Sequence, residues 1–326
     1  MKRIFVLVIS TILLIFCCAA CSEKESNKLT NVRIAFLPNI THAQALLMKE
    51  EGKLEEVYGD GINITWTSFN TGTEIITALF AKEIDISYIG PVPAISAYSQ
   101  SQGDVKIIAG AANGGSVLVA RNGSTIKTVN DLKGKTVTVA SFGNNQHLSL
   151  LSLLSNNWLS PISDGGDVDI RAIANADAVN LMNDGKIDAA FIPEPWGSVM
   201  VDNGSAYFAL DYNEIDEKGI PNTTVVVVRK EFYDNHPDEV EMFLQEHKDA
   251  TDYINNHTDE ARSLINKQYK ALTEIAIDDT ILISALSRTE FSVTIPYDSI
   301  MDFAQISVDN GFIEEMPRSD IFMEAG

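Results

Sequence analysis

Short apolar strands alternate with helical segments along most of this 326-residue chain, and this alternation restricts the fold more than any other feature. One series covers residues 32 to 111, and a second begins at Ser116. The run Thr223–Val228 is β-branched without alternation, which predicts a strand buried on both faces. From Glu231 onward the pattern is mainly helical. This order predicts an α/β fold with mostly parallel sheets covered by helices.

The two series also match each other. Segment 32–42 corresponds to segment 137–147, and segment 82–90 corresponds to segment 185–193. The offsets are 105 and 103 residues, and the first places His42 opposite His147. Two matches in the same order indicate an internal duplication, and the length suits two domains of about 150 residues each. We therefore expect two similar lobes with a cleft between them.

The N-terminal segment is typical of a secreted lipoprotein. A basic start, Met1–Arg3, precedes an apolar run, Ile4–Ala20, that ends in small residues before Cys21. This pattern predicts a secretory signal over residues 1–20, with an uncleaved membrane anchor as the alternative. The ending resembles the lipobox of bacterial lipoproteins, which implies that Cys21 is lipidated. Residues 21–30 are polar and charged, and we expect them to form a flexible tether.

Cysteine content and charge exclude several classes of function. All three cysteines lie within the first 21 residues, so the rest of the chain has no disulfide, thiolate metal site or cysteine nucleophile. The 24 Lys and Arg residues face 45 Asp and Glu residues, a formal net charge of −21. An excess of negative charge argues against nucleic-acid binding and against electrostatic attachment to an anionic membrane.

Three segments carry a resemblance to a known family. Residues 36–43, Phe-Leu-Pro-Asn-Ile-Thr-His-Ala, follow the first strand and resemble the solute-binding proteins of ABC importers for nitrate, taurine and aliphatic sulfonates. Residues 130–137 resemble the segment that opens the second lobe in that superfamily, and residues 188–196 resemble its strand end with an acidic-Pro-aromatic turn. The resemblance covers residues 31 to 260.

The resemblance implies a two-lobe periplasmic-binding-protein fold (type II) with a ligand cleft between the lobes. Residues 31–114 and 225–326 would form the first lobe, and residues 115–224 the second. The implied function is a lipid-anchored, extracytoplasmic binding protein that captures a small oxyanion and delivers it to an ABC permease with its ATPase. We expect a monomer that needs neither cofactor nor metal, is not an enzyme, and touches the membrane only through Cys21.

Ligands of open α/β sheets bind beyond the carboxyl ends of the strands, where helices begin. Six such loops in this chain are rich in Asn, Thr, Ser and Gly and contain no Lys or Arg. They cover residues 38–42, 70–74, 90–93, 141–146, 175–177 and 193–196. An anion can still bind there through backbone N–H groups and helix N-termini. The predicted ligand-binding residues are Asn39, Thr41, His42, Thr71, Gly72, Thr73, Gly90, Pro91, Phe142, Gly143, Asn144, Asn145, Glu194 and Trp196.

Several of these residues also have an ordinary structural interpretation. Asn and Thr before a helix are often plain N-caps. His42 could donate to an oxyanion when protonated, or it could be a surface histidine without a function. Trp196 could form a wall of the pocket or fill the core of its lobe. Glu194 would repel an anion, so we expect it to orient a neighbour or to meet an amine, as in taurine.

Three other functions stay open at this point. An enzyme on the same fold is disfavoured, since the chain lacks a Gly-x-Ser-x-Gly elbow, a cysteine-rich motif and clustered histidines. A pyrimidine or thiamin precursor could replace the anion, with Trp196, Tyr88 and Phe142 stacking on its ring. A sensor that reports its ligand to a membrane kinase is the third.

Overall fold

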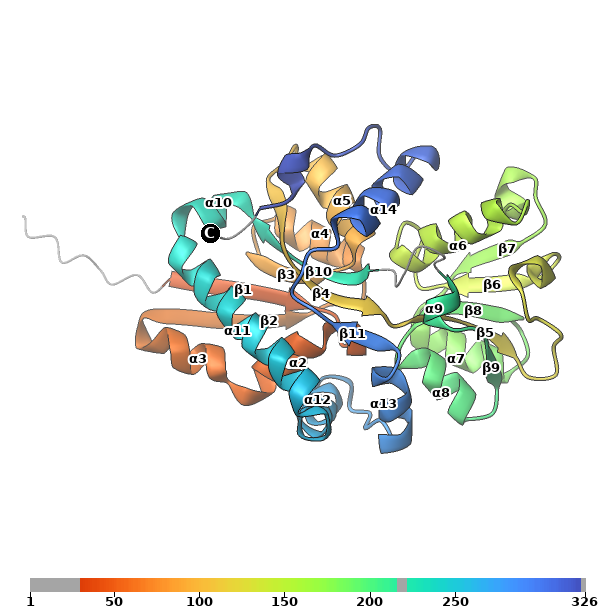
Figure 1. Cartoon of the computed structure of the whole chain (residues 1–326), viewed down its shortest axis with the longest axis horizontal. Helices are drawn as coiled ribbons and strands as arrows, with labels where there is room; N and C mark the ends of the chain where they lie inside the picture. Colours follow the sequence, from red (N-terminus) through yellow and green to blue (C-terminus); the bar gives the residue numbers. More distant parts are fainter. Residues whose placement is uncertain (1–29, 216–221, 324–326) are drawn as a thin grey trace, which may run out of the picture.

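The computed structural model describes residues 30–215 and 222–323. The predicted signal, the lipidation of Cys21 and nearly all of the tether lie outside the described residues. None of the helices within the described ranges is long and apolar enough to cross a membrane. The described residues form two bodies that lie side by side, each with its own sheet (Figure 1).

The two bodies are called lobe 1 and lobe 2 after their sheets. Lobe 1 has six strands in the order β11-β4-β10-β3-β1-β2, and lobe 2 has five in the order β7-β6-β8-β5-β9. The lobe 1 strands are β1 (Thr30–Phe36), β2 (Ile62–Ser68), β3 (Ile86–Ile89), β4 (Val105–Gly114), β10 (Asn222–Arg229) and β11 (Thr289–Phe291). The lobe 2 strands are β5 (Ser116–Arg121), β6 (Thr136–Val139), β7 (Asp169–Ala172), β8 (Ala189–Pro193) and β9 (Ala206–Leu210).

Most strands of each sheet run in the same direction, as expected, but both sheets are mixed because antiparallel strands lie among them. Strand β1 pairs in parallel with β2 and β3, and β6 pairs in parallel with β7 and β8. Strand β10 is antiparallel to both β3 and β4, and β5 is antiparallel to both β8 and β9. The physical reason is the chain path. After each passage between the lobes, the entering strand runs into the middle of a sheet against the direction of its neighbours.

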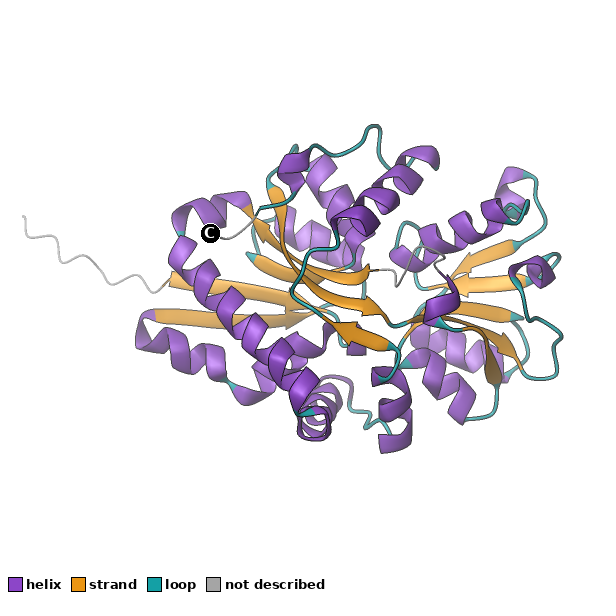
Figure 2. Ribbon diagram, in the orientation of Figure 1, coloured by secondary structure: helices purple, strands orange, loops and turns teal. Residues whose placement is uncertain are grey.

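Helices surround both sheets (Figure 2). The lobe 1 helices are α2 (Ala43–Glu51), α3 (Lys53–Tyr58), α4 (Gly72–Phe80), α5 (Pro91–Gln100), α10 (Lys230–Asn235), α11 (Pro237–Asn256), α12 (Thr258–Thr273), α13 (Asp279–Leu286) and α14 (Tyr297–Asp309). The lobe 2 helices are α6 (Asn145–Asn156), α7 (Asn175–Asn183), α8 (Trp196–Asp202) and α9 (Tyr212–Ile215). Helices α2 and α3 are separated at Gly52, which has a left-handed φ of 67°.

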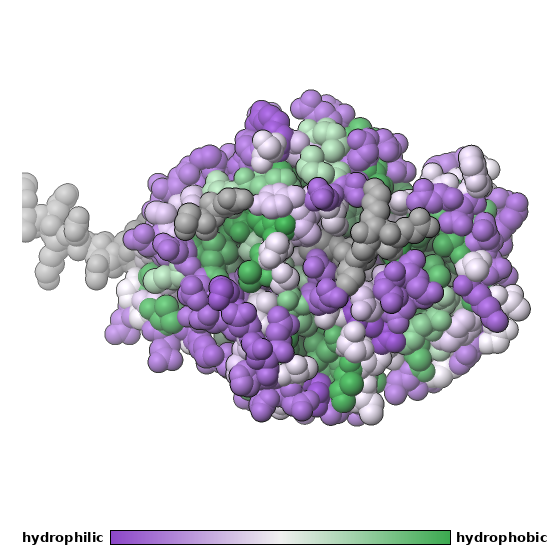
Figure 3. Space-filling model, in the orientation of Figure 1, coloured by the Kyte–Doolittle hydropathy of each residue, from purple (hydrophilic) through white to green (hydrophobic). Residues whose placement is uncertain are grey.

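Each sheet has an apolar core on both faces. In β10, Val226 and Val228 belong to one core, whereas Val225 and Val227 belong to the core on the opposite face. The predicted strand buried on both faces is therefore confirmed. Most of the outer face in Figure 3 is hydrophilic, in keeping with the large excess of charged acidic residues.

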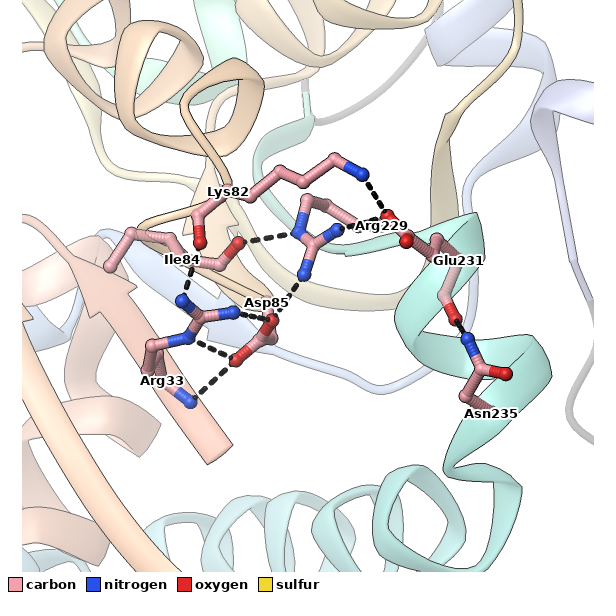
Figure 4. A network of polar contacts seen from close by, with 7 residues as sticks. All are labelled: Arg33, Lys82, Ile84, Asp85, Arg229, Glu231 and Asn235. Carbon is pink, nitrogen blue, oxygen red and sulfur yellow. Dashed lines mark hydrogen bonds and ion pairs between the residues drawn. The ribbon is translucent and has the colours of Figure 1, made fainter. Parts of the chain in front are cut away.

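A buried carboxylate lies at the amino end of the lobe 1 sheet (Figure 4). The carboxylate of Asp85 accepts hydrogen bonds from Arg33 Nε at 2.7 Å and from Arg229 Nη2 at 2.6 Å. It also accepts the backbone N–H of Arg33 at 3.0 Å. In lobe 2, Asp188 accepts the backbone N–H of Thr136 at the same distance and pairs with Arg121. The matched residues Asp85 and Asp188 thus make similar contacts in the two sheets.

Candidate ligand-binding cleft

A cavity of about 80 Å³ lies between the two lobes. Residues that follow β1, β2 and β3 form its lobe 1 side, and residues that follow β6, β7 and β8 form its lobe 2 side. Eight of the predicted ligand-binding residues line it: Asn39, Thr41, His42, Thr71, Gly72, Gly90, Asn144 and Asn145. The cavity therefore has the location expected for a solute site in an open α/β sheet.

Three of these lining residues also cap helices. The Asn39 side chain accepts the Thr41 N–H at the start of the 3₁₀ helix η1 (Ile40–His42), and Asn144 accepts the His147 N–H at 2.8 Å at the start of α6. Thr71 caps α4 in a reciprocal capping box with Glu74. Capping and lining are compatible, because a cap holds its side chain at the helix end that faces the cavity.

The N-terminus of α5 has a different kind of cap. Pro91 and Pro93 have no N–H, and the N–H of Ala94 donates to the Gly90 carbonyl oxygen. The N–H of Val92 donates to Asn145 Oδ1 at 3.0 Å, across the boundary between the lobes. The first turn of α5 therefore directs its free N–H to a side chain of lobe 2. The helix starts that present N–H groups without an intrahelical acceptor at the cavity are therefore those of α6 and α4.

The two matched histidines make the same contact in the two lobes. His42 Nδ1 accepts the N–H of Leu37, and His147 Nδ1 accepts the N–H of Gly143. Burial lowers the pKa of His42 to about 3 and the pKa of His147 to about 4. His42 is therefore neutral in this structure, and the alternative interpretation of it as a surface histidine is wrong because the residue is 2% exposed. The neutral ring, with Nδ1 accepting, keeps its proton on Nε2, which remains a hydrogen-bond donor.

The cavity lining contains no Lys, Arg, Asp or Glu among the described residues. Its polar groups are hydroxyls, amides and the neutral His42. Asn175 at the start of α7 also lines the cavity, and its buried Oδ1 has no hydrogen-bond partner among the described residues. This oxygen fits a solute that carries an N–H or O–H group. No group of three or more His, Asp or Glu residues in the described ranges is arranged to hold a metal ion.

Six of the predicted residues lie outside the cavity lining: Thr73, Pro91, Phe142, Gly143, Glu194 and Trp196. Glu194 is fully buried beside the cavity, where its carboxylate accepts the backbone N–H and the hydroxyl of Ser198, each at 2.9 Å. Arg288 Nε from lobe 1 lies 3.9 Å away. Glu194 thus orients a neighbour, one of the two roles that the sequence suggested for it. Burial raises the pKa of Glu194 to about 7, although the hydrogen bonds from Ser198 and the charge of Arg288 lower this pKa.

None of the three aromatic residues expected to stack on a ring lines the cavity. Tyr88 is fully buried in the lobe 1 core, where its hydroxyl lies 2.9 Å from His247 Nδ1. Trp196 packs against an apolar core of lobe 2. Phe142 is 56% exposed and lies against His147, with the ring centroids 5.0 Å apart. The interpretation of these residues as a stacking platform is therefore wrong.

Sequence reasoning missed nine of the lining residues: Leu37, Asn70, Pro93, Ala140, Ser141, Gln146, Asn175, Pro193 and Thr223. Eight of these belong to, or directly adjoin, the loops that the sequence selected, so the loops were better predicted than the individual side chains. Thr223 lies instead at the start of β10, where the chain returns to lobe 1. The predicted position of this crossover could have indicated Thr223 as a lining residue, because a chain that crosses between two lobes passes the base of their cleft.

Comparison with known proteins agrees with this geometry. The model of the NMT1-like family matches residues 25–267. The chain belongs to the NMT1-like family. A protein of Bacillus subtilis (strain 168) named for binding aliphatic sulfonates is 28% identical to this family member over 316 residues, which is 95% of this chain and 90% of that protein. The taurine-binding periplasmic protein of Escherichia coli (strain K12) is 29% identical over 198 residues, 60% of this chain and 59% of that protein.

A solved structure supports the fold of this NMT1-like protein. The alkanesulfonate-binding protein SsuA from Xanthomonas axonopodis pv. citri, bound to MOPS, matches with a TM-score of 0.72 at 20% identity. The match covers 89% of this chain and 95% of that chain. The two-lobe periplasmic-binding-protein fold and the family resemblance of the sequence motifs are therefore confirmed.

Proposed function

We propose that the protein is the solute-binding component of an ABC importer, which captures a small oxyanion in the cavity between its lobes and delivers it to a permease with its ATPase. Aliphatic sulfonates, taurine and nitrate are the candidate solutes. The observation that carries the proposal is the cavity itself, whose polar side chains are uncharged and which is surrounded by helix starts from both lobes. Relatives named for binding aliphatic sulfonates and taurine support the same class.

Recognition of an anion in this cavity would depend on donors and not on a cationic side chain. The start of the 12-residue helix α6 offers the N–H groups of Asn145 and Gln146, which have no intrahelical acceptor. The hydroxyl of Thr41 and the Nε2–H of His42 add further donors. Asn175 Oδ1 would accept from the amine of a zwitterion such as taurine.

The proposed location of the protein outside the cytoplasm rests on its N-terminal sequence. Residues 1–20 would be removed as a signal, and lipidated Cys21 would anchor the mature protein in the envelope as a monomer. The lobes would consist of residues 31–114 with 225–326, and of residues 115–224 apart from residues 222–224, which belong to β10 of lobe 1. Closure around the solute would be a hinge motion, in which the closed form is stabilised by contacts from both lobes.

A thermal-shift screen tests the ligand. Methanesulfonate, ethanesulfonate, taurine, nitrate and a hydroxymethylpyrimidine are compared with sodium chloride at equal ionic strength, because a protein of net charge −21 responds to salt itself. A solute at 100 times its Kd adds about 2.7 kcal/mol to the free energy of unfolding, which raises Tm by several degrees. No shift beyond chloride with any anion contradicts an oxyanion ligand. A shift with the pyrimidine alone favours a pyrimidine precursor.

A further inference from the structure

The Asn145 side chain links the two lobes at the wall of the cavity. It extends from the first residue of α6 in lobe 2 and is 7% exposed. Its Oδ1 accepts the Val92 N–H of α5 at 3.0 Å, and its Nδ2 donates to the Thr223 carbonyl oxygen of β10 at 2.9 Å. Both partners belong to lobe 1. The amide therefore uses both of its ends on backbone groups of the opposite lobe.

These two hydrogen bonds fix the orientation of the amide. One partner is only a donor and the other is only an acceptor, so the carboxamide has a single orientation that satisfies both. An aspartate of the same size could still accept the Val92 N–H, but it could not donate to the Thr223 oxygen. An alanine would satisfy neither group and would remove the carboxamide from the cavity wall.

Gly90 provides the space for this amide. A Cβ at residue 90 would lie 2.6 Å from Asn145 Nδ2 and 2.7 Å from Asn145 Oδ1, closer than real atoms approach. The φ of Gly90 is −67°, which any residue adopts, so the backbone conformation does not require glycine here. The close approach of the Asn145 amide does require it.

Both residues line the cavity, which at about 80 Å³ is small beside the ~300–1,000 Å³ of pockets for drug-sized ligands. We propose that the Asn145 carboxamide, seated on Gly90, is the wall that limits the length of the solute, so that the protein selects oxyanions with a short tail over those with a long alkyl tail. This inference rests on the proposed function and specifies its substrate class. Asn145 acts here as a specificity-determining residue.

Tail length gives a clear physical signature. Burial of each CH₂ group in an apolar environment tightens binding by about fourfold, so without a limiting wall longer sulfonates would bind more tightly. With the wall present, we expect affinity to fall as the tail grows. The measured quantity is the ratio of Kd values for a long and a short solute, which a uniform loss of binding does not change.

Isothermal titration calorimetry with methanesulfonate, ethanesulfonate, butanesulfonate and octanesulfonate tests the inference. We expect the wild-type protein to prefer methanesulfonate over butanesulfonate by about tenfold or more, and Asn145→Ala to reduce that ratio by about tenfold. Asn145→Asp keeps the size of the side chain, so it should weaken all solutes while it preserves the ratio. Asn157→Ala, at the opposite end of α6, should leave both affinities unchanged.

A glycine variant provides a second, independent test. Gly90→Ala should displace the amide and lower the affinity for every solute, whereas Gly61→Ala, where a Cβ meets nothing within 4 Å, should not. Circular dichroism and melting curves establish that each variant is folded. An unchanged ratio in Asn145→Ala, or equal wild-type affinities along the series, would overturn the inference alone. Binding of none of the anions by the wild-type protein would overturn the proposed function and the inference together.

Discussion

The guanidinium group of Arg288 lies 3.9 Å from the centre of the Phe208 ring, and the two residues come from different lobes. Arg288 follows α13 of lobe 1, and Phe208 belongs to β9 of lobe 2. The same guanidinium group pairs with Asp211 of lobe 2 at 3.0 Å. Arg288 therefore connects the two lobes beside α13 and α8, two helices that lie next to each other in Figure 1.

Replacement of Arg288 should loosen this connection. Arg288→Ala removes a largely buried ion pair and a cation–π contact, and we expect the free energy of unfolding to fall by about 2–4 kcal/mol. Arg171→Ala is the matched control, because Arg171 is exposed and pairs with Asp169 inside lobe 2, where such pairs contribute about 0–1 kcal/mol. Urea unfolding of both variants measures the difference. Equal losses of unfolding free energy in the two variants would show that the contact between the lobes does not stabilise the protein.

The crossover from lobe 1 to lobe 2 depends on Gly115. Its φ is +69°, and a Cβ would lie 2.6 Å from Thr41 Cγ2 and 2.9 Å from Thr289 Oγ1. Gly123 has a similar φ of +81° but open space around it. We expect Gly123→Ala to cost about 1–2 kcal/mol from backbone strain alone. Gly115→Ala should cost more and should also weaken solute binding, because Thr41 lines the cavity.

Chemical denaturation and calorimetry distinguish the two glycine variants. A Gly115→Ala protein that unfolds at the same denaturant concentration as Gly123→Ala, with unchanged solute affinity, would contradict the close packing at the crossover. A larger loss for Gly115→Ala that includes binding is the expected result.

Much of the fold could be predicted from the sequence because its signals are local. The alternation of strands and helices depends on neighbouring residues, and it correctly indicated two α/β lobes. The duplication extends to individual contacts. Asn39 caps the helical segment after β1 and Asn144 caps the one after β6, and His42 and His147 both accept a loop N–H. The position of the cleft could therefore be predicted from helix starts with polar caps.

The features that sequence reasoning missed depend on distant residues. Asn145 and Val92 are 53 positions apart, and Arg288 and Asp211 are 77 positions apart. No periodicity connects such pairs, so the sequence did not distinguish an Asn that contacts solute from one that spans the lobes. The antiparallel direction of β10 has the same origin, because it depends on where the returning chain enters the sheet. The role of Glu194 could not be predicted either, because it depends on the burial of the side chain, which the sequence does not show.

The equivalent carboxylates Asp85 and Asp188 should differ in their contribution to stability. Asp85 is fully buried and accepts hydrogen bonds from two guanidinium groups (Figure 4). The Asp188 side chain is 27% exposed and pairs with one guanidinium group. Asp85→Asn leaves two arginines without their carboxylate, and we expect a loss of about 3–5 kcal/mol. For Asp188→Asn we expect about 1 kcal/mol. Unfolding curves of the two variants, recorded side by side, check the order, and a smaller loss at Asp85 would contradict it.

Glu194 should make the stability of the protein depend on pH near neutrality. Burial raises its pKa to about 7 from an ordinary value near 4.5. Between these values the folded chain retains a proton on Glu194 that the unfolded chain has lost. The stabilising contribution is therefore fully present below about pH 4.5 and is lost as the pH rises through 7. A shift of this size corresponds to about 3 kcal/mol.

The variant Glu194→Gln isolates this contribution, because glutamine does not titrate. The free energy of unfolding of the wild-type protein, measured relative to Glu194→Gln, should fall by about 3 kcal/mol between pH 4.5 and pH 7.5. Buried histidines such as His42 change the stability of both proteins alike, so their effect cancels in the difference. Ser198→Ala is the companion variant. It retains the carboxyl group but removes the hydroxyl hydrogen bond that lowers its pKa, so the fall should extend to higher pH. A difference that stays constant across this range would mean that Glu194 is already ionised in the folded protein at acidic pH.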